Sequence, residues 1–204
     1  MVWKRCAAVV LLAALAGCAT RGVQQLPTLE NWSQRNDVLT RLTVWSQTGR
    51  IGIRTRDEAN SGTLKWRQND RQFFAEIDGP FGVSGLRLTG TPEAVTLAGH
   101  KIETRTVVDP EQALLVETGV RVPVAGLRYW LLGVPDPARP SEITLNDDNL
   151  AAVIVQGGWT IEYPEYRRWS VNALPRRIRA QSGDTSIVIV VKDWNIAEQA
   201  TKSL

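Results

Sequence analysis

The chain has 204 residues, of which 43% are hydrophobic and 22% charged, and its formal net charge is +3. This length suits one domain with a sizeable core, with room for a processed leader. Because charges of both signs are mixed along the chain, with no block of like charge and no basic helix face, a nucleic-acid partner is not expected.

The N-terminal stretch has the pattern of a bacterial secretion signal. Lys4 and Arg5 precede an apolar run at 7–16, which has the length of a signal's apolar segment and is too short to span a membrane. The run ends in Leu-Ala-Gly followed by Cys18, which resembles the bacterial lipoprotein signal. That resemblance implies cleavage before Cys18, an S-diacylglycerol on its thiol and an N-acyl chain on the new amine. The alternative is an ordinary signal peptide with a cysteine at this place.

Loss of this leader would change the charge and the cysteine content of the mature protein. Removing Lys4 and Arg5 leaves a net charge of about +1. Cys6 lies in the leader and Cys18 is the attachment site, so no disulfide and no thiolate metal site is expected. Ala19, in place of Asp, resembles outer-membrane sorting. The expected organisation is a signal peptide at 1–17, a lipidated tether at 18–27 and a folded domain at 28–204.

The folded domain begins with an amphipathic helix at 28–42, with Thr28 as its N-cap. A membrane-surface role for this helix is possible, and packing on a sheet is favoured. From 43 to 107 the pattern changes to short strands with two-residue alternation, which is typical of an antiparallel meander with one apolar face. Turns are expected at residues 60–62, 69–70, 90–92 and 99–100.

One hairpin, at residues 73–89, has an unusual tip. Its two strands alternate regularly, but Gly79, Pro80, Phe81 and Gly82 lie between them. Glycine and proline supply turn geometry, whereas nothing in a turn requires an aromatic residue. Phe81 therefore has two possible destinations, the core of the protein or another apolar phase.

Two helices then interrupt the strands. Asp109 is an N-cap with Pro110 at the first helical position, and Gly119 ends that helix. A second helix follows Pro123 and ends at Gly133. Further strands are expected at 141–145, 150–156, 159–163, 166–171, 176–181 and 186–192, with a two-residue turn at 157–158. The sequence thus predicts a mainly β protein with helices (α+β), whose roughly ten or eleven strands curl into a barrel-like sheet under about three helices.

Catalytic patterns are absent from the sequence. The one histidine, His100, is expected in a solvated turn, and no Gly-x-Ser-x-Gly elbow or metal-ligand spacing is present. A pair of carboxylates that meet in space is not excluded. Tryptophan is over-represented, with eight residues against three Tyr and three Phe. These rings either fill a core or line an apolar cavity.

Several stretches together resemble the LolB family of outer-membrane lipoprotein receptors. They are Trp66-Arg67-Gln68, Gly79 to Gly82 with Leu86 beyond, 127–135, 156–163 and Lys192-Asp193-Trp194. The resemblance implies an open antiparallel β-barrel with a helical lid and an apolar cavity for acyl chains. It places Trp66, Trp130, Trp159, Trp194 and Leu131 at that cavity. It places Phe81 on a protruding membrane-insertion loop formed by Gly79, Pro80, Phe81 and Gly82.

The function that the resemblance implies is binding and transfer without catalysis. The protein would be lipid-anchored in the outer membrane, facing the periplasm, and would pass cargo lipoproteins from a periplasmic LolA-like carrier to outer-membrane lipid. No cofactor is expected besides the acyl groups on Cys18, and a monomer suffices. The alternatives are a structural envelope lipoprotein without a cavity and a lipoprotein hydrolase.

Overall fold

A computed structural model describes residues 26–79, 85–100, 102–170 and 172–196, which fall in one unit, Leu26–Ala197. The expected leader, Cys18 and the loop residues Pro80, Phe81 and Gly82 lie outside the described residues. No helix in the described part of the chain combines the length and hydropathy needed to cross a membrane.

Eleven strands in the described residues form one antiparallel sheet. They are β1 Val44–Arg54, β2 Ala59–Asn69, β3 Gln72–Asp78, β4 Leu86–Thr91, β5 Ala94–Gly99, β6 Ile102–Val107, β7 Ser141–Leu145, β8 Ala151–Gln156, β9 Trp159–Trp169, β10 Asn172–Ser182 and β11 Thr185–Ile196. Their spatial order is β6-β5-β4-β3-β2-β1-β11-β10-β9-β8-β7. Two meanders are thus joined by the pairing of the first strand with the last, and β6 and β7 are the outer strands of a sheet that stays open.

The sheet has one apolar face because buried and exposed residues alternate along several of its strands. In β2, Leu64 and Trp66 are buried, whereas Lys65 and Arg67 are exposed. Trp66 lies opposite Ala75 of β3 and Gln47 of β1. The strand period of two therefore brings buried side chains of neighbouring strands together on the inner face.

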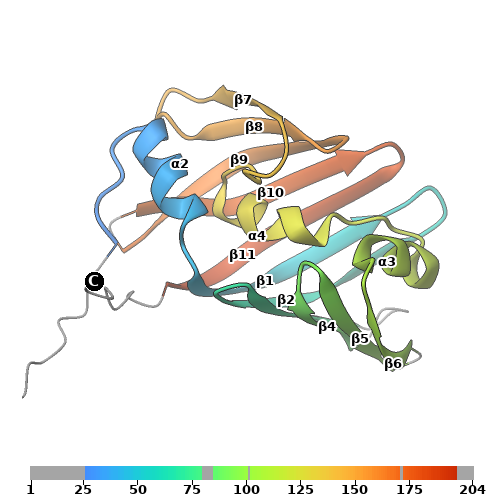
Figure 1. The fold of residues 1–204 in the computed structure, drawn as a ribbon. Coiled ribbons are helices and arrows are strands. Elements are labelled where there is room, and N and C mark those ends of the chain that lie inside the picture. The colour runs from blue at the N-terminus through green and yellow to red at the C-terminus, as the bar shows by residue number, and fades with distance from the viewer. Residues whose placement is uncertain (1–25, 80–84, 101, 171, 197–204) are drawn as a thin grey trace, which may run out of the picture. The chain divides into compact units, whose positions relative to one another are not determined.

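Three helices in the described residues cover this inner face: α2 Trp32–Thr40, α3 Pro110–Thr118 and α4 Val124–Leu132 (Figure 1). The caps of α3 are as predicted, with the Asp109 side chain accepting from Gln112 N and Gly119 in the left-handed conformation. Gly133 ends α4 in the same way. The predicted cap at Thr28 is wrong, because Asn31 caps α2 by accepting from Gln34 N.

Two strand predictions are also corrected. Residues 60–62 form no turn. They belong to β2 and pair with β1, so this strand begins at Ala59. Residues 159–163 and 166–171 are not two strands, because β9 runs unbroken from Trp159 to Trp169. Its pairing with β10 shifts register near Pro175, a bulge that makes room for proline within paired strands.

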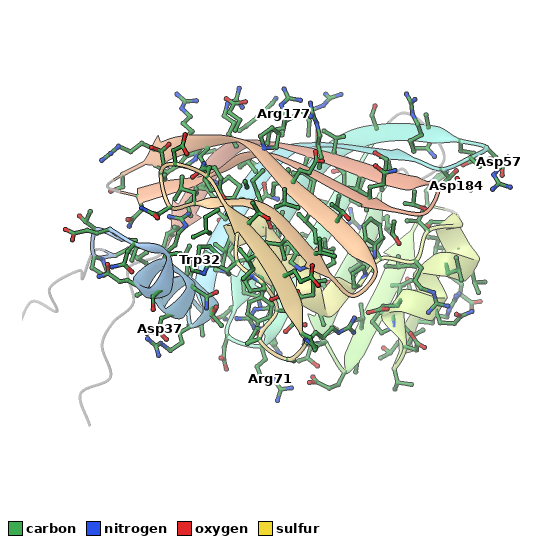
Figure 2. All side chains as sticks on the ribbon, turned by 90° about the horizontal axis from the view of Figure 1, so that it is seen from above. Trp32, Asp37, Asp57, Arg71, Arg177 and Asp184 are labelled. Atoms are coloured by element: carbon green, nitrogen blue, oxygen red, sulfur yellow. The ribbon has the colours of Figure 1, made fainter. Side chains whose placement is uncertain are left out.

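The two ends of the sheet differ in what they carry. Figure 2 shows Asp57 and Asp184 at one end, and Trp32 and Asp37 of α2 at the other. Asp57 lies in the β1–β2 turn, and Asp184 in the β10–β11 turn. An ion pair between Arg56 and Asp184 ties these two turns together. The observed architecture confirms the predicted mainly β fold with an open sheet and covering helices.

Candidate apolar binding site

The inner face of the sheet holds an apolar cavity between β1–β4 and the helices α3 and α4, here called chamber A. Its lining includes Ile51, Leu64, Trp66, Ala75, Leu114 and Leu131. Chamber A has a volume of about 80 Å³. One water needs about 10–15 Å³ of such volume, so chamber A already has room for several atoms of an apolar ligand.

A second, smaller cavity lies beside the first, on the half of the sheet formed by β9–β11. This cavity, chamber B, has a volume of about 20 Å³ and is lined by residues that include Pro123, Trp130, Trp159, Ile178 and Ala180. Five side chains line both chambers: Val122, Leu127, Leu131, Ile187 and Ile189. The two chambers are therefore separated only by aliphatic side chains of α4, β11 and the segment before α4.

Chamber A opens at the end of the sheet that carries the β1–β2 turn. Thr55, Glu58, Asn60 and Thr118 line both chamber A and a wide surface hollow of about 850 Å³, here called the mouth. The mouth is polar, with several carboxylates in its lining, including that of Asp57. An apolar interior thus meets water through a polar rim, which is the usual layout of a pocket for an apolar ligand with a polar head.

Chamber A ends against Trp66, which is held rigidly. The indole N–H of Trp66 donates to Oε1 of Gln68 at 3.1 Å, and Nε2 of Gln68 donates to the carbonyls of Asp70 and Gln72. The Trp66 ring stacks on Phe73 with centroids 5.1 Å apart and on Trp45 at 6.2 Å. Since every polar atom of the Gln68 amide is satisfied, this buried polar group stabilises the wall.

Chamber B ends against a wall built in the same way. Trp130 and Trp159 contact each other with ring centroids 6.2 Å apart. The indole N–H of Trp130 donates to Oε1 of Gln156 at 2.9 Å, and Nε2 of Gln156 donates to the carbonyls of Asp136 and Arg139. Each chamber therefore ends on a tryptophan whose N–H is fixed by a buried glutamine, Gln68 or Gln156.

The predicted site residues are not all brought together. Trp66 and Leu131 line chamber A, and Trp130, Trp159 and Leu131 line chamber B. Trp194 lies elsewhere in the described core, where its ring packs 5.3 Å from Trp45 and its N–H donates to the carbonyl of Pro175. Of the predicted insertion loop, only Gly79 is described, at the end of β3. The acyl-chain role of these residues stays a prediction.

The sequence reasoning missed Gln68 and Gln156 as supports. A signal for Gln68 was available, because it lies two residues from Trp66 and hence on the same apolar face. Gln156 shares the buried face of β8 with Ile154 in the same way. A polar side chain on an apolar strand face needs a partner, and in both strands the partner is a tryptophan.

A buried cation supports the opposite end of the interior. The Arg35 side chain of α2 is 1% exposed, donates to the carbonyl of Ala173 and lies 5.6 Å from the centre of the Tyr166 ring. Burial lowers the pKa of Arg35 and raises that of Tyr166. The Tyr166 hydroxyl donates to the carbonyl of Ala151 at 2.8 Å. These contacts fix α2 on β10.

Groups that could support catalysis or metal binding are sparse. His100 lies exposed in the β5–β6 turn, as predicted. Among the described residues, no group of three His, Cys, Asp or Glu side chains is placed to hold a metal ion. The features that the fold does bring together are apolar walls and a polar mouth.

This arrangement defines a class of protein, an open antiparallel β-sheet whose helix-covered inner face encloses an apolar, tryptophan-walled cavity. A family model described as "Outer membrane lipoprotein LolB" matches residues 43–194. The chain is 35% identical to the outer-membrane lipoprotein LolB of Pseudomonas fluorescens, over 90% of this chain and 91% of that one. It is 34% identical to that of Stutzerimonas stutzeri, over 94% and 95%.

The chain therefore belongs to the LolB family, as its motifs indicated. A solved structure of a LolA superfamily protein from Nitrosomonas europaea has a similar fold, with a TM-score of 0.56 at 8% identity. That similarity covers 83% of this chain and 94% of the other. At such low identity, the similarity shows only that the two proteins share a fold, an open barrel-like sheet.

Proposed function

We propose that this protein is an outer-membrane-anchored receptor that accepts lipoproteins from a periplasmic carrier and inserts them into the outer membrane. The observation that carries the proposal is the apolar interior: chamber A opens to the polar mouth, and chamber B lies beside it behind a layer of aliphatic side chains. The interior has the apolar lining that acyl chains need and widens to take whole chains, and the peptide part of a lipoprotein stays in the solvent-exposed mouth. The names of the relatives and the membership of the LolB family support the same location and role.

The mechanism is binding and transfer without bond breaking. Removing apolar surface from water contributes about 25 cal/mol per Å², so each methylene that enters the cavity from an exposed position favours capture. Release needs a second apolar phase that offers the chain at least as much burial. The bilayer is that phase, and no nucleotide or other cofactor is required for transfer down such a gradient.

Two further parts of the proposed receptor are the lipid anchor and the insertion loop. Cys18 carries an S-diacylglycerol and an N-acyl chain, which together bind the membrane stably where one chain does not. Residues 18–27 tether the domain 28–204 to the bilayer. Phe81, on the loop with Gly79, Pro80 and Gly82, enters the lipid and gains about 1.5–3 kcal/mol on full burial. The protein acts as a monomer, and its partners are a LolA-like carrier, cargo lipoproteins and outer-membrane lipid.

Transfer of a lipoprotein from loaded carrier to liposomes tests this proposal. The lipid-free Cys18→Ala chain is compared with the same chain carrying Phe81→Glu. Both are expected to take cargo from the carrier, and only the chain with Phe81 is expected to deliver it to liposomes. Phe74→Glu is the matched control, because Phe74 lies on the outer face of β3 with its ring 4.5 Å from the Arg67 guanidinium carbon. It should capture and deliver normally.

The outcomes separate the parts of the proposal. Failure of every chain to take cargo from the carrier would refute the receptor function and favour a structural lipoprotein. Capture with equal delivery by the Phe81→Glu chain would refute the loop's role and leave the cavity's role intact. Impaired delivery by Phe74→Glu would show that any charge on this hairpin is harmful.

A further inference from the structure

We propose that the apolar interior is forked, and that it holds two acyl chains of one ligand in separate arms. One chain lies in chamber A and ends against Trp66. The other turns across β11 and ends with its terminal carbons in chamber B, against the contacting rings of Trp130 and Trp159. This inference rests on the proposed function, since it assigns the acyl chains of the cargo to places in the cavity.

The two arms extend in different directions relative to the strands. Chamber A follows the strands, because Asn60 of β2 lines the mouth and Trp66 of β2 lines the closed end. Trp66 lies six residues after Asn60, a distance of about 20 Å along the strand. Chamber B lies across the strands. Ile53, Ile187, Ala180 and Ile161 lie opposite one another on β1, β11, β10 and β9, and three strand spacings amount to about 14 Å.

An aliphatic partition divides the arms. Leu127 and Leu131 of α4 face Ile187 and Ile189 of β11, and all four side chains line both chambers. One chain cannot follow the strands to Trp66 and also cross this partition to Trp159. Two chains that share one head group at the mouth can do so, because each takes its own arm.

The end walls show that both arms are built as sites. Buried packing alone would not require the same device twice, yet each arm ends on an indole fixed by a glutamine, Gln68 for Trp66 and Gln156 for Trp130. A rigid wall at each end sets how far a chain can enter. Chamber B, at about 20 Å³ against 80 Å³ for chamber A, takes only the end of a chain.

The ligand class that fits a forked apolar cavity is a lipid with two chains on one head, such as a diacylglyceryl group. Two peptides serve as probes, both with the same sequence. One carries S-dipalmitoylglyceryl-cysteine at its N-terminus, and the other carries a single palmitoyl chain. The two-chain peptide should bind more tightly than the single-chain peptide, because the end of its second chain buries further apolar surface in chamber B.

Fluorine NMR of the Cys18→Ala chain labelled with 5-fluorotryptophan reports each arm directly. The resonances of Trp66 and Trp159 are assigned by Trp66→Phe and Trp159→Phe. One equivalent of the two-chain peptide should shift both resonances together. The single-chain peptide should shift Trp66, in the larger arm, first, and should shift Trp159 only at higher concentration.

A matched pair of alanines allows each arm to be filled. Ala75 lines chamber A and Ala180 lines chamber B, and both are buried on inward strand positions. Ala180→Leu should weaken the two-chain peptide about tenfold, because it excludes about two methylene groups from burial, and should leave the single-chain peptide unchanged. Ala75→Leu should weaken both peptides. Thermal unfolding by circular dichroism verifies that each variant folds.

The results distinguish this inference from the proposed function. If neither peptide binds, the acyl-binding function itself fails. If both peptides bind and the single-chain peptide also shifts the Trp66 and Trp159 resonances together at every concentration, the interior is a single pocket and the fork is refuted. The fork is refuted likewise if Ala180→Leu and Ala75→Leu weaken binding of the two peptides in the same way. Should Ala180→Leu fail to fold, the resonance shifts of the unfilled chain decide the question.

Discussion

Gln156 is expected to be the side chain whose loss most damages the wall of chamber B. It is 2% exposed and accepts from the indole N–H of Trp130 and the amide of Asp136, both at 2.9 Å. Its amide nitrogen donates to the carbonyls of Asp136 and Arg139 at 2.9 and 3.0 Å. One side chain thus joins β8 to α4 and to the loop that follows it.

Gln156→Leu keeps the bulk of the side chain and removes all four hydrogen bonds. Three of the groups left behind, the Trp130 N–H and the two backbone groups of Asp136, are buried. Each unsatisfied buried group costs about 1–3 kcal/mol, and the added apolar burial of leucine offsets part of the total. The net loss is therefore about 3–5 kcal/mol, which for a domain of this size lowers the Tm by about 10 °C.

Urea unfolding followed by tryptophan fluorescence and by far-ultraviolet circular dichroism measures this loss. Gln181→Leu is the matched control, since Gln181 is an exposed glutamine on β10, and it should change stability by at most about 0.5 kcal/mol. Equal unfolding midpoints for Gln156→Leu and Gln181→Leu would refute the reasoning, because the four hydrogen bonds would then contribute nothing that leucine packing does not replace.

Two further predictions concern buried polar groups. Both amide atoms of Gln47, which is 1% exposed, lack a hydrogen-bond partner among the described residues, so Gln47→Met should raise the free energy of unfolding by about 1 kcal/mol; a loss measured in urea would contradict this. Burial raises the pKa of Tyr163 and of Tyr166. Their stabilising contribution is complete below the unfolded pKa of about 10 and falls above it by up to about 1.4 kcal/mol per pH unit for each tyrosine. Tyr163→Phe should roughly halve that slope in alkaline urea titrations, and an unchanged slope would contradict the assignment.

Local patterns in the sequence were sufficient to predict the helices after residue 107. Asp109 followed by Pro110 fixes the start of α3, and Gly119 and Gly133 adopt the left-handed conformation that ends α3 and α4. These signals act within one turn of helix, so no distant contact is needed to read them. The alternation of Leu64 and Trp66 with polar residues is equally local.

Predictions failed where distant pairing decides the structure. Residues 60–62 have a turn-like composition, but β1 runs alongside them and supplies hydrogen-bond partners along the full length of β2. Pro164 suggests a break in β9, yet β10 accommodates it with a register shift. Asn31 prevails over Thr28 as the cap because the residues before it are held elsewhere: the Leu29 amide donates to the Asn172 side chain at 2.9 Å.

The candidate site was predictable in kind and only partly in detail. Excess tryptophan on apolar faces indicated aromatic walls, and Trp66, Trp130 and Trp159 do line the chambers. Trp194 carries the same pattern and lies away from both linings, because the register of β11 against β1 sets it beside Trp45. Which tryptophan faces a void depends on where α4 packs, and the strand pattern contains no information about that.

Entry of whole acyl chains requires the interior to widen, and α3 is expected to move most easily. Its buried side chains are Pro110 and Leu114, and Val116 is 70% exposed on its outer side. The ion pairs that Glu111 and Glu117 make lie at the surface, where such pairs contribute about 0–1 kcal/mol each. By contrast, α4 buries five residues, including its Trp130, whose indole is fixed by a glutamine.

Hydrogen exchange should therefore release the amides of α3 well before those of α4, since local opening starts where few apolar contacts are lost. Binding of the two-chain peptide should leave α4 protected and alter exchange chiefly in α3. Peptides covering residues 110–118 and 124–132 in a mass-spectrometric experiment report the two helices separately. Earlier exchange in α4 than in α3 would mean that the interior opens by lifting the partition, in which case Leu127 and Leu131 would not keep the two arms apart while a chain enters.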